Sequence, residues 1–350
     1  MRMMRTNLRA AALVFVAAAA LAMPFRPALA CSVCLAGDPI YDAEGASAQE
    51  KGEINAYFEV RGWTKRSGAL LHHGAEEPPP GGEETGGAEG AGAEEEAGHS
   101  EEPREKNRGR RLNAYFSWTP LDRLTLTLNV PYNFNKITEE EGHESIEIDA
   151  NGFGDVALAT SLVLWRDRDV LPSTFIEGRA FLKTPTGKSR MRTDGFRDKH
   201  VQPGTGSWDY GFGLAGTHRL EWGSLYSSVF YRINGDGSLD YTYGDVFLAN
   251  AAVTVPLGHA LKSANLTPFI PGLELNYRWA EKDVSHGEDY EDSGGSILYA
   301  TPFLRVQLPW FEGRRPPSLR AAVQIPLTNA WLHGYQHEDP VWSVGIQVPF

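Results

Sequence analysis

Histidine and carboxylate side chains occur together in three segments of the chain that we expect to connect strands. The residues concerned are His143, Glu144, His286, Glu288, His333 and His337. Imidazole and carboxylate groups together suit borderline divalent metals such as zinc, copper and nickel. These six residues are therefore candidate ligands for a divalent cation, and we expect no other cofactor. The alternative is that the loops are solvated, with divalent ions bridging them to the phosphates of lipopolysaccharide.

The chain has two cysteines, Cys31 and Cys34, which form a C-x-x-C pattern. No histidine follows the second cysteine, so covalent haem attachment is not supported. In an oxidising compartment we expect the two thiols to form a local disulfide. Lipidation of Cys31, or metal or redox exchange by the pair, are the alternatives.

The arrangements of residues that mark most hydrolases are missing from the sequence. We find no nucleophile elbow, no zinc-protease helix and no evident serine–histidine dyad on neighbouring strands. The remaining candidate is Ser207 with His200 or His218. We therefore expect that the protein is not an enzyme.

Alternating apolar and polar residues predict the elements that must position these groups. In segment 124–135 every second residue is apolar, which is typical of a strand with two unlike faces. Leu124, Leu126, Leu128 and Val130 are expected to face lipid, whereas Thr125, Thr127 and Asn129 face the interior. The same test predicts twelve strands, at 52–64, 109–119, 122–136, 152–166, 172–184, 206–220, 222–234, 243–256, 264–281, 294–309, 317–328 and 340–350. Because proline cannot donate to a β-ladder, we expect a bulge at Pro131.

The predicted connections alternate in length. Those near 120–121, 167–171, 221, 257–263 and 310–316 are short, and those near 65–108, 137–151, 185–205, 235–242, 282–293 and 329–339 are mostly longer. The acidic, low-complexity composition of 65–108 predicts a disordered outer loop. Short turns on one side and long loops on the other are typical of outer-membrane barrels, and a β-sandwich has no reason to show them. We predict an all-β fold, an antiparallel transmembrane β-barrel of about 12 strands.

The two ends of the chain agree with export to the outer membrane. Residues 1–30 have three early arginines, an apolar run and an Ala28-Leu29-Ala30 cleavage pattern, which predict a signal peptide. A periplasmic segment, 31–51, then precedes the barrel at 52–350. In the last strand, Trp342, Val344, Ile346, Val348 and Phe350 resemble the C-terminal signal read by the barrel-assembly machinery. We expect the protein in the outer membrane of a Gram-negative bacterium, with both termini in the periplasm and with outer-membrane lipid and lipopolysaccharide as partners.

Charge is unevenly distributed along the chain. The formal net charge is −12, and removal of residues 1–30, with four arginines and no acids, gives 33 − 4 − 45 = −16. A nucleic-acid partner is therefore not expected. The segment 183–200 is the basic exception, with Lys183, Lys188, Arg190, Arg192, Arg197 and Lys199. Binding to lipopolysaccharide, or folding inward against the acidic loops, would each explain it.

Four short segments carry a resemblance to a known family. They are NGFGDV at 151–156, KTPTGK at 183–188, GTGSWDYGFG at 204–213 and YTYGD at 241–245. In order and spacing they resemble the MetA-pathway-of-phenol-degradation family of outer-membrane proteins, over about residues 110–256. For the Gly-Asp pairs we expect that glycine allows a sharp turn or close approach while Asp155 and Asp245 satisfy loop amides. The alternative is that the two aspartates line the lumen.

Function follows from the barrel and from the resemblance. Twelve strands are expected to enclose a narrow polar bore, wider than that of an eight-stranded barrel and narrower than that of a porin. We therefore expect a channel for a small-molecule solute, and the family resemblance implies hydrophobic or aromatic compounds. The alternative is a surface metal-binding or structural barrel whose histidine- and glutamate-rich loops carry no transport.

Overall fold

The structure is a computed structural model that describes residues 51–67, 104–141, 144–169, 171–192, 199–290, 293–308, 316–333 and 336–350. Cys31, Cys34 and His143 lie outside these residues, as do the signal peptide and most of the 65–108 loop. None of the helices in the described ranges is long and apolar enough to cross a membrane.

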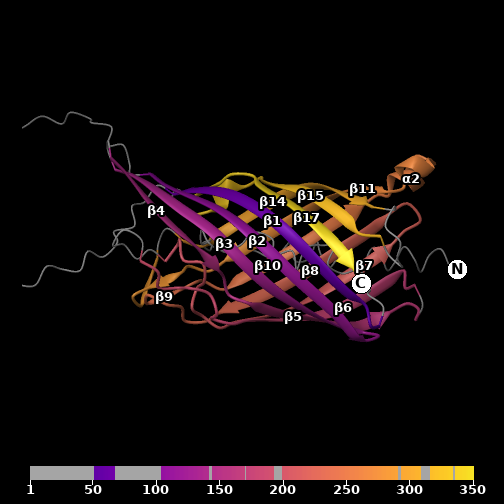
Figure 1. Ribbon diagram of the computed structural model, residues 1–350, viewed down its shortest axis with the longest axis horizontal. Helices are drawn as coiled ribbons and strands as arrows, with labels where there is room; N and C mark the ends of the chain where they lie inside the picture. The colour runs from indigo at the N-terminus through magenta and orange to yellow at the C-terminus, as the bar shows by residue number, and fades with distance from the viewer. Residues whose placement is uncertain are drawn as a thin grey trace, which may run out of the picture.

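Twelve antiparallel strands form a closed barrel, as the sequence predicted (Figure 1). They are β1 (Ile54–Ser67), β2 (Arg104–Leu121), β3 (Leu124–Glu141), β4 with β5 (Glu144–Phe153 and Ala157–Arg166), β6 (Thr174–Lys183), β7 (Asp209–Arg219), β8 (Ser224–Asn234), β10 (Val246–Thr254), β11 (Phe269–Ala280), β14 (Gly295–Gln307), β15 (Ser318–Pro326) and β17 (Val341–Pro349). Each strand pairs with the next along the chain, and β4 and β5 together count as one because both pair with β3. Closure comes from β1, which pairs with β2 on one side and β17 on the other.

Side chains alternate between the outer surface and the interior along each strand, because successive strand residues point to opposite faces. On β2, Phe116 and Trp118 are 45% and 50% exposed on the outside, whereas Asn113 and Thr119 are buried. On β3, Leu128 is exposed and Asn129 is buried, as predicted. The outer surface is therefore an apolar band and the interior is rich in polar groups.

The two ends of the barrel differ. At the turn end, where β1 begins and β17 ends, the connections include the tight β2–β3 and β7–β8 turns. At the loop end lie the connections β1–β2, β3–β4, β6–β7, β8–β10, β11–β14 and β15–β17. Figure 1 shows the C-terminus at the same end as helix α2 (Leu257–Ala260), and β4 and β9 (Tyr241–Thr242) at the other.

Several short strands and a 3-10 turn lie at the loop end. Strand β9 pairs with β12 (Val284–Ser285), which pairs with β13 (Glu288–Asp289), and this small sheet is separate from the barrel. Strand β16 (His337–Glu338) pairs with the end of β1, and a 3-10 turn, η3, spans Asn329–Trp331.

Two predicted connections are wrong. The segment 257–263, expected to be a short turn, lies in a longer connection that holds α2 and a second 3-10 turn, η2 (Ala264–Leu266), so β11 begins at Phe269 and not at 264. The segment 137–151, expected to be a long loop, is mostly strand, because β3 runs to Glu141 and β4 starts at Glu144. Period-two alternation continues there with charged residues on the outer face, such as Glu147 and Asp149, and apolar residues on the inner face, such as Ile148 and Ala150.

Proline 131 does not bulge its own strand. The β2–β3 register passes through Pro131, opposite Asn113, without a shift. The irregularity lies in the neighbouring chain, where three residues, 154–156, separate β4 from β5 opposite only Val130 and Pro131. The Pro131 carbonyl still accepts a hydrogen bond from the Gly154 amide at 2.9 Å. An extra residue in the neighbouring strand thus accommodates the ladder hydrogen bond that Pro131 cannot donate.

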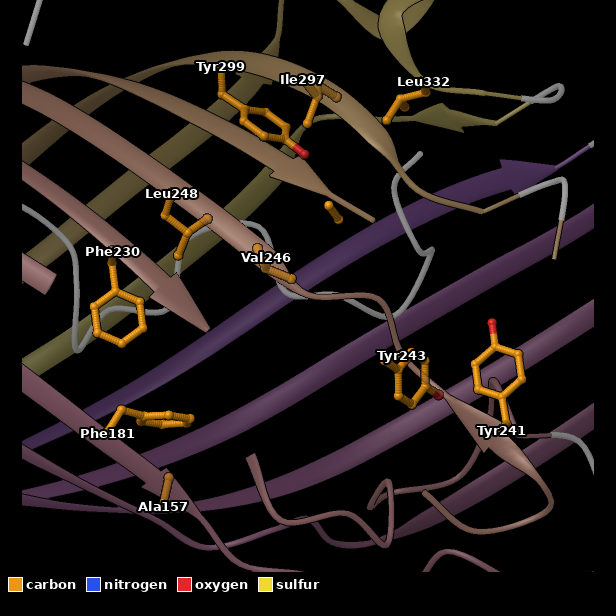
Figure 2. Close-up of a cluster of buried hydrophobic side chains, with 11 residues drawn as sticks. Ala157, Phe181, Phe230, Tyr241, Tyr243, Val246, Leu248, Ile297, Tyr299 and Leu332 are labelled. Carbon is orange, nitrogen blue, oxygen red and sulfur yellow. The ribbon is translucent and has the colours of Figure 1, made fainter. Parts of the chain in front are cut away.

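Aromatic side chains also enter the interior. Figure 2 shows a buried cluster to which Phe181 of β6, Phe230 of β8 and Tyr299 of β14 contribute. The rings of Phe181 and Phe230 meet edge to face with centroids 6.4 Å apart. The sequence predicted a polar bore, but the structure places an aromatic cluster along part of its wall.

Candidate functional site

The described parts of the connection between β6 and β7, 184–192 and 199–208, fold into the barrel, and we call them the inward segment. Asn133 Nδ2 on β3 donates to the carbonyl of Pro203 at 2.6 Å, and Asn135 Nδ2 donates to that of Val201 at 3.0 Å. Val201 is 1% exposed. Residues 200–203 thus lie inside the barrel, as one explanation for the basic segment 183–200 predicted, whereas Lys188, Arg190 and Arg192 are exposed, and binding of these three to lipopolysaccharide stays a prediction.

A buried ion cluster holds the base of the inward segment. Lys183 Nζ lies 2.7 Å from Asp209 Oδ2 and 3.3 Å from Asp155 Oδ2. Asp155 also accepts hydrogen bonds from the amides of Gly187 at 2.8 Å and Thr205 at 2.7 Å. One lysine and two aspartates thus tie β6, β7, the β4–β5 junction and both arms of the inward segment together.

Three glycines allow the backbones in this cluster to touch. A Cβ atom on Gly187 would lie 2.7 Å from the carbonyl carbon of Gly154 and 2.8 Å from Cα of Gly204. A Cβ atom on Gly204 would lie 2.7 Å from Asp155 Oδ1. Real Cβ atoms do not approach so closely, so no other residue fits these positions without movement.

The four segments that carry the family resemblance are neighbours in this structure. The first three supply the ion cluster and the touching glycines. In the fourth, Asp245 Oδ1 accepts a hydrogen bond from the amide of Asn234 at 2.9 Å. Both aspartates therefore satisfy backbone amides, as expected, and Asp155 also lines the interior cavity.

That cavity, of about 100 Å³, lies between the inward segment and β1, β2 and β3. Its charged lining residues are four basic and two acidic: Arg61, Arg111, Lys183, Arg232, Asp155 and Asp209. The aromatic lining residues are Trp63, Tyr115, Phe181 and Tyr243. The lining residues thus carry a formal charge of 4 − 2 = +2, with Lys183 next to both aspartates.

Arg111 and Arg61 show how the arginines are held. The guanidinium of Arg111 lies 5.7 Å from the ring centroid of Trp63 and donates to Asn133. Arg61 lies 3.4 Å from Glu59, two residues earlier on the same inward face of β1. Charged and aromatic groups are therefore interleaved along one wall of the cavity.

A second buried network crosses the interior near the loop end. Glu338 lies 2.6 Å from Arg278 of β11 and 2.8 Å from Lys65 of β1, and accepts a hydrogen bond from the hydroxyl of Tyr299. Burial by itself would raise the pKa of Glu338, but Arg278 and Lys65 together lower it to about 2. This carboxylate joins the β15–β17 connection to three separate strands.

The candidate metal ligands do not gather among the described residues, where no three His, Cys, Asp or Glu side chains are placed to share an ion. His286 forms the turn between β12 and β13, with φ +53°, together with Gly287. Glu288 begins β13, His337 begins β16, and His333 follows η3. Glu144 opens β4, and His143 lies outside the described residues. The metal site stays a prediction.

Of the candidates for catalysis, Ser207 and His218 occupy different parts of the barrel, whereas His200 lines the same cavity as Asp209, the hydrogen-bond partner of Ser207. Ser207 Oγ donates to Asp209 at 2.7 Å, before the start of β7. His218 Nδ1 lies 2.7 Å from Thr174 Oγ1 near the other end of β7. At about 3.4 Å per residue, roughly 35 Å of strand separates Ser207 from His218.

The last strand has the predicted geometry. Trp342 and Val344 are 43% and 50% exposed on the outer surface, and Ser343 is buried. Ile346 and Val348 share their face, and Phe350 is 77% exposed at the turn end. Recognition of this strand by the assembly machinery stays a prediction.

Sequence reasoning missed the buried ion pairs, although a signal for them was present. Glutamate and arginine stand two residues apart in Glu59–Arg61 and Glu177–Arg179, and each pair shares an inward face. Two opposite charges at two-residue spacing, on the polar face of an alternating strand, indicate an ion pair inside a barrel. Lys183 was noted as one of several basic residues, and its partners Asp155 and Asp209 only as parts of short motifs.

Comparison with known proteins agrees with this architecture. The model of the family described as "Putative MetA-pathway of phenol degradation" matches residues 106–270, just under half of the chain. The COG4313 outer membrane channel from Pseudomonas putida F1 has a similar structure, with a TM-score of 0.58 at 14% identity, over 90% of this chain and 100% of that one. The translocator domain of the autotransporter NalP from Neisseria meningitidis gives 0.44 at 12% identity, over 88% and 91%.

At these identities the structural likeness shows the fold alone. No curated protein matches the chain. The resemblance predicted from the four segments is confirmed, because residues 106–270 match the model of the MetA-pathway-of-phenol-degradation family and the fold is a β-barrel of the outer-membrane type.

Proposed function

We propose that the protein is an outer-membrane channel for small solutes, with the loop end outside and both termini in the periplasm. The observation that carries the proposal is the lined cavity inside a closed barrel whose outer surface is apolar. The structurally similar COG4313 protein is described as an outer membrane channel, which supports this role.

The lining favours small aromatic solutes that carry a negative charge. Arg111 over Trp63 and the nearby Arg61 offer guanidinium groups, which bind carboxylates or phenolates in fixed geometry. Tyr115 and Phe181 supply apolar ring surface in the same cavity. A cavity of about 100 Å³ next to the inward segment suits one small ring.

Planar bilayers and proteoliposome swelling test both parts of the proposal. Mature protein should give discrete conductance with a reversal potential that indicates anion preference. Swelling should be faster with benzoate than with cyclohexanecarboxylate, benzyl alcohol or benzylamine. Folded protein that shows neither conductance nor swelling would overturn the channel, and equal rates for the four solutes would overturn the solute class alone.

Side-chain labelling tests the orientation. A cysteine introduced at Ser285 in the loop-end sheet should react with an impermeant maleimide on intact cells, whereas one introduced at Ser263, beside α2, should not. The reverse labelling pattern would contradict the proposed topology without affecting the channel.

A further inference from the structure

A ladder of basic residues lies on the outer surface of the barrel at the loop end. The outer basic ladder consists of Lys106, Arg108 and Arg110 on β2, with Arg66 on β1 and Lys136 on β3. Alternation along β2 places the three β2 residues on the outer face, because Asn107 and Gly109 between them are buried. At two-residue spacing, successive charges on β2 are about 7 Å apart.

Strand register extends the ladder sideways. Arg66 stands opposite Lys106, and Arg108 stands opposite Lys136. Neighbouring strands are about 4.8 Å apart, so the five cations form one compact patch across three strands. Such a patch offers several positive charges to one multiply charged ligand.

The ladder begins where the apolar band ends. Arg110 stands opposite Phe134 of β3 on one side and Gly62 of β1 on the other. The ring of Trp342 lies over Gly62. One step further toward the turn end, Leu112 pairs with Val60 and both are exposed on the outside. Aromatic residues at the edge of an apolar band mark the membrane interface, so the ladder lies at headgroup level.

Within the described ranges, carboxylates form ion pairs with only two of the cations of the outer basic ladder. Arg66 pairs with Asp339 at 3.0 Å, and Lys136 pairs with Glu147 at 2.7 Å. Among the described residues no carboxylate forms an ion pair with the three β2 cations, of which Arg108 and Arg110 are exposed. Three cations held in register on a rigid strand therefore face the headgroup region.

We propose that the outer basic ladder binds the phosphate groups of lipopolysaccharide in the outer leaflet. Lipid A carries acyl chains beneath a phosphorylated sugar, and the apolar band with the ladder above it matches that order of groups. Arginine and lysine bind phosphate through charge-assisted hydrogen bonds. A lipid with one phosphate would engage one cation, whereas several phosphates on one headgroup would engage the row on β2. The proposal rests on the orientation given above, and it does not depend on transport.

Binding of Kdo2-lipid A to the full mature protein in detergent tests the site. The triple variant Lys106→Gln, Arg108→Gln and Arg110→Gln should weaken binding at least tenfold. A control triple removes the same charge at the turn end, through Arg123→Gln, Arg168→Gln and Lys262→Gln, and should bind as the unaltered protein does. Heat-modifiable migration on gels checks that both triples are folded.

Two further ligands separate the sources of phosphate. Dephosphorylated lipid A should bind weakly to the unaltered protein, and phosphatidylglycerol in mixed micelles should bind less tightly than Kdo2-lipid A. Equal loss of binding in both triples, or undiminished binding of dephosphorylated lipid A, would overturn the site. Tighter binding of phosphatidylglycerol would show a general lipid headgroup site instead. A conductance measurement on the same samples shows separately whether the channel is intact.

Discussion

Lys183 of β6 and Asp209 of β7 occupy directly opposed positions on neighbouring strands, with Nζ 2.7 Å from Oδ2. The lysine ends its strand and the aspartate begins the next, so this ion pair closes the base of the inward segment. Asp155 reaches the same lysine from the β4–β5 junction. One cation thus joins both aspartates at the base of the inward segment.

Removal of that cation should loosen the inward segment. In Lys183→Met the aliphatic stem remains, but Asp155 and Asp209 face each other without a counter-charge. Breaking a buried ion pair costs about 3–5 kcal/mol, so we expect a lower melting temperature in detergent and a higher single-channel conductance. Lys188→Met is the control, because Lys188 is exposed in the same segment. Unchanged conductance and melting temperature in Lys183→Met would contradict a role for the cluster in holding the segment.

Contact between glycine backbones gives a second, purely steric test. Gly204→Ala places a methyl group 2.7 Å from both Asp155 Oδ1 and Cα of Gly187. Overpacking of this kind costs about 1–3 kcal/mol, so limited proteolysis should cut the inward segment faster. In the control, Gly152→Ala, the new methyl group meets Pro203 at an ordinary 3.4 Å. Equal proteolysis of the two variants would show that the close contact is not needed.

Stability should depend on pH through Glu338. Its pKa falls from 4.5 to about 2 on folding, because the attraction of Arg278 and Lys65 exceeds the effect of burial. Since the folded value is the lower one, the stabilisation is complete above pH 4.5 and is lost as the pH falls toward 2. A shift of this size corresponds to about 3 kcal/mol. Denaturant unfolding at several pH values should show this loss.

The variant Glu338→Gln should be about 3 kcal/mol less stable at pH 7 and should lose most of the slope between pH 4.5 and 2. Asp339→Asn is the matched control, since Asp339 is the next residue and forms a partly exposed ion pair with Arg66 at 3.0 Å. Its effect should stay below about 1 kcal/mol. A Glu338→Gln protein that keeps the acid slope would assign it to another group.

Ion selectivity should respond to Arg111. The variant Arg111→Gln removes one cavity cation, retains a donor for Asn133, and should shift the reversal potential in a salt gradient toward cation preference. Benzoate swelling should slow several-fold while benzyl alcohol swelling changes little. Arg123→Gln, at the β2–β3 turn, removes the same charge outside the cavity. A selectivity that changes equally in both variants would argue against a specific role for the cavity arginines.

The strands could be predicted because lipid and interior impose opposite demands on alternate residues. Leu128 and Asn129 are neighbours in sequence, and one is exposed to the outside while the other is buried. Such alternation fixes the strands to within a few residues, and the C-terminal strand could be located from Trp342 and Val344 in the same way. The method fails where the pattern is reversed, as in the hairpin that joins β3 to β4, in which Ile148 is buried inside and Glu147 is exposed outside.

The interior arrangement could not be predicted, because it depends on which strands meet across the barrel. Glu338 is 273 residues from Lys65 in sequence and 2.8 Å from it in space. Nothing local indicates that the residue beside His337 belongs to an ion network and not to a metal site. The four family segments could be recognised in the sequence, but only the folded structure shows that the first three of them meet at Lys183.

The pairing of β1 with β17 has a consequence for biogenesis. The first and last strands of the described barrel hydrogen-bond over eight opposed residue pairs, from Asn55 with Pro349 to Gly62 with Trp342. Until these two strands pair, β1 and β17 each present an unsatisfied sheet edge, and either could recruit a foreign strand. Loss of β17 would leave β1 and β15 as open edges, so the closed barrel would become an open sheet.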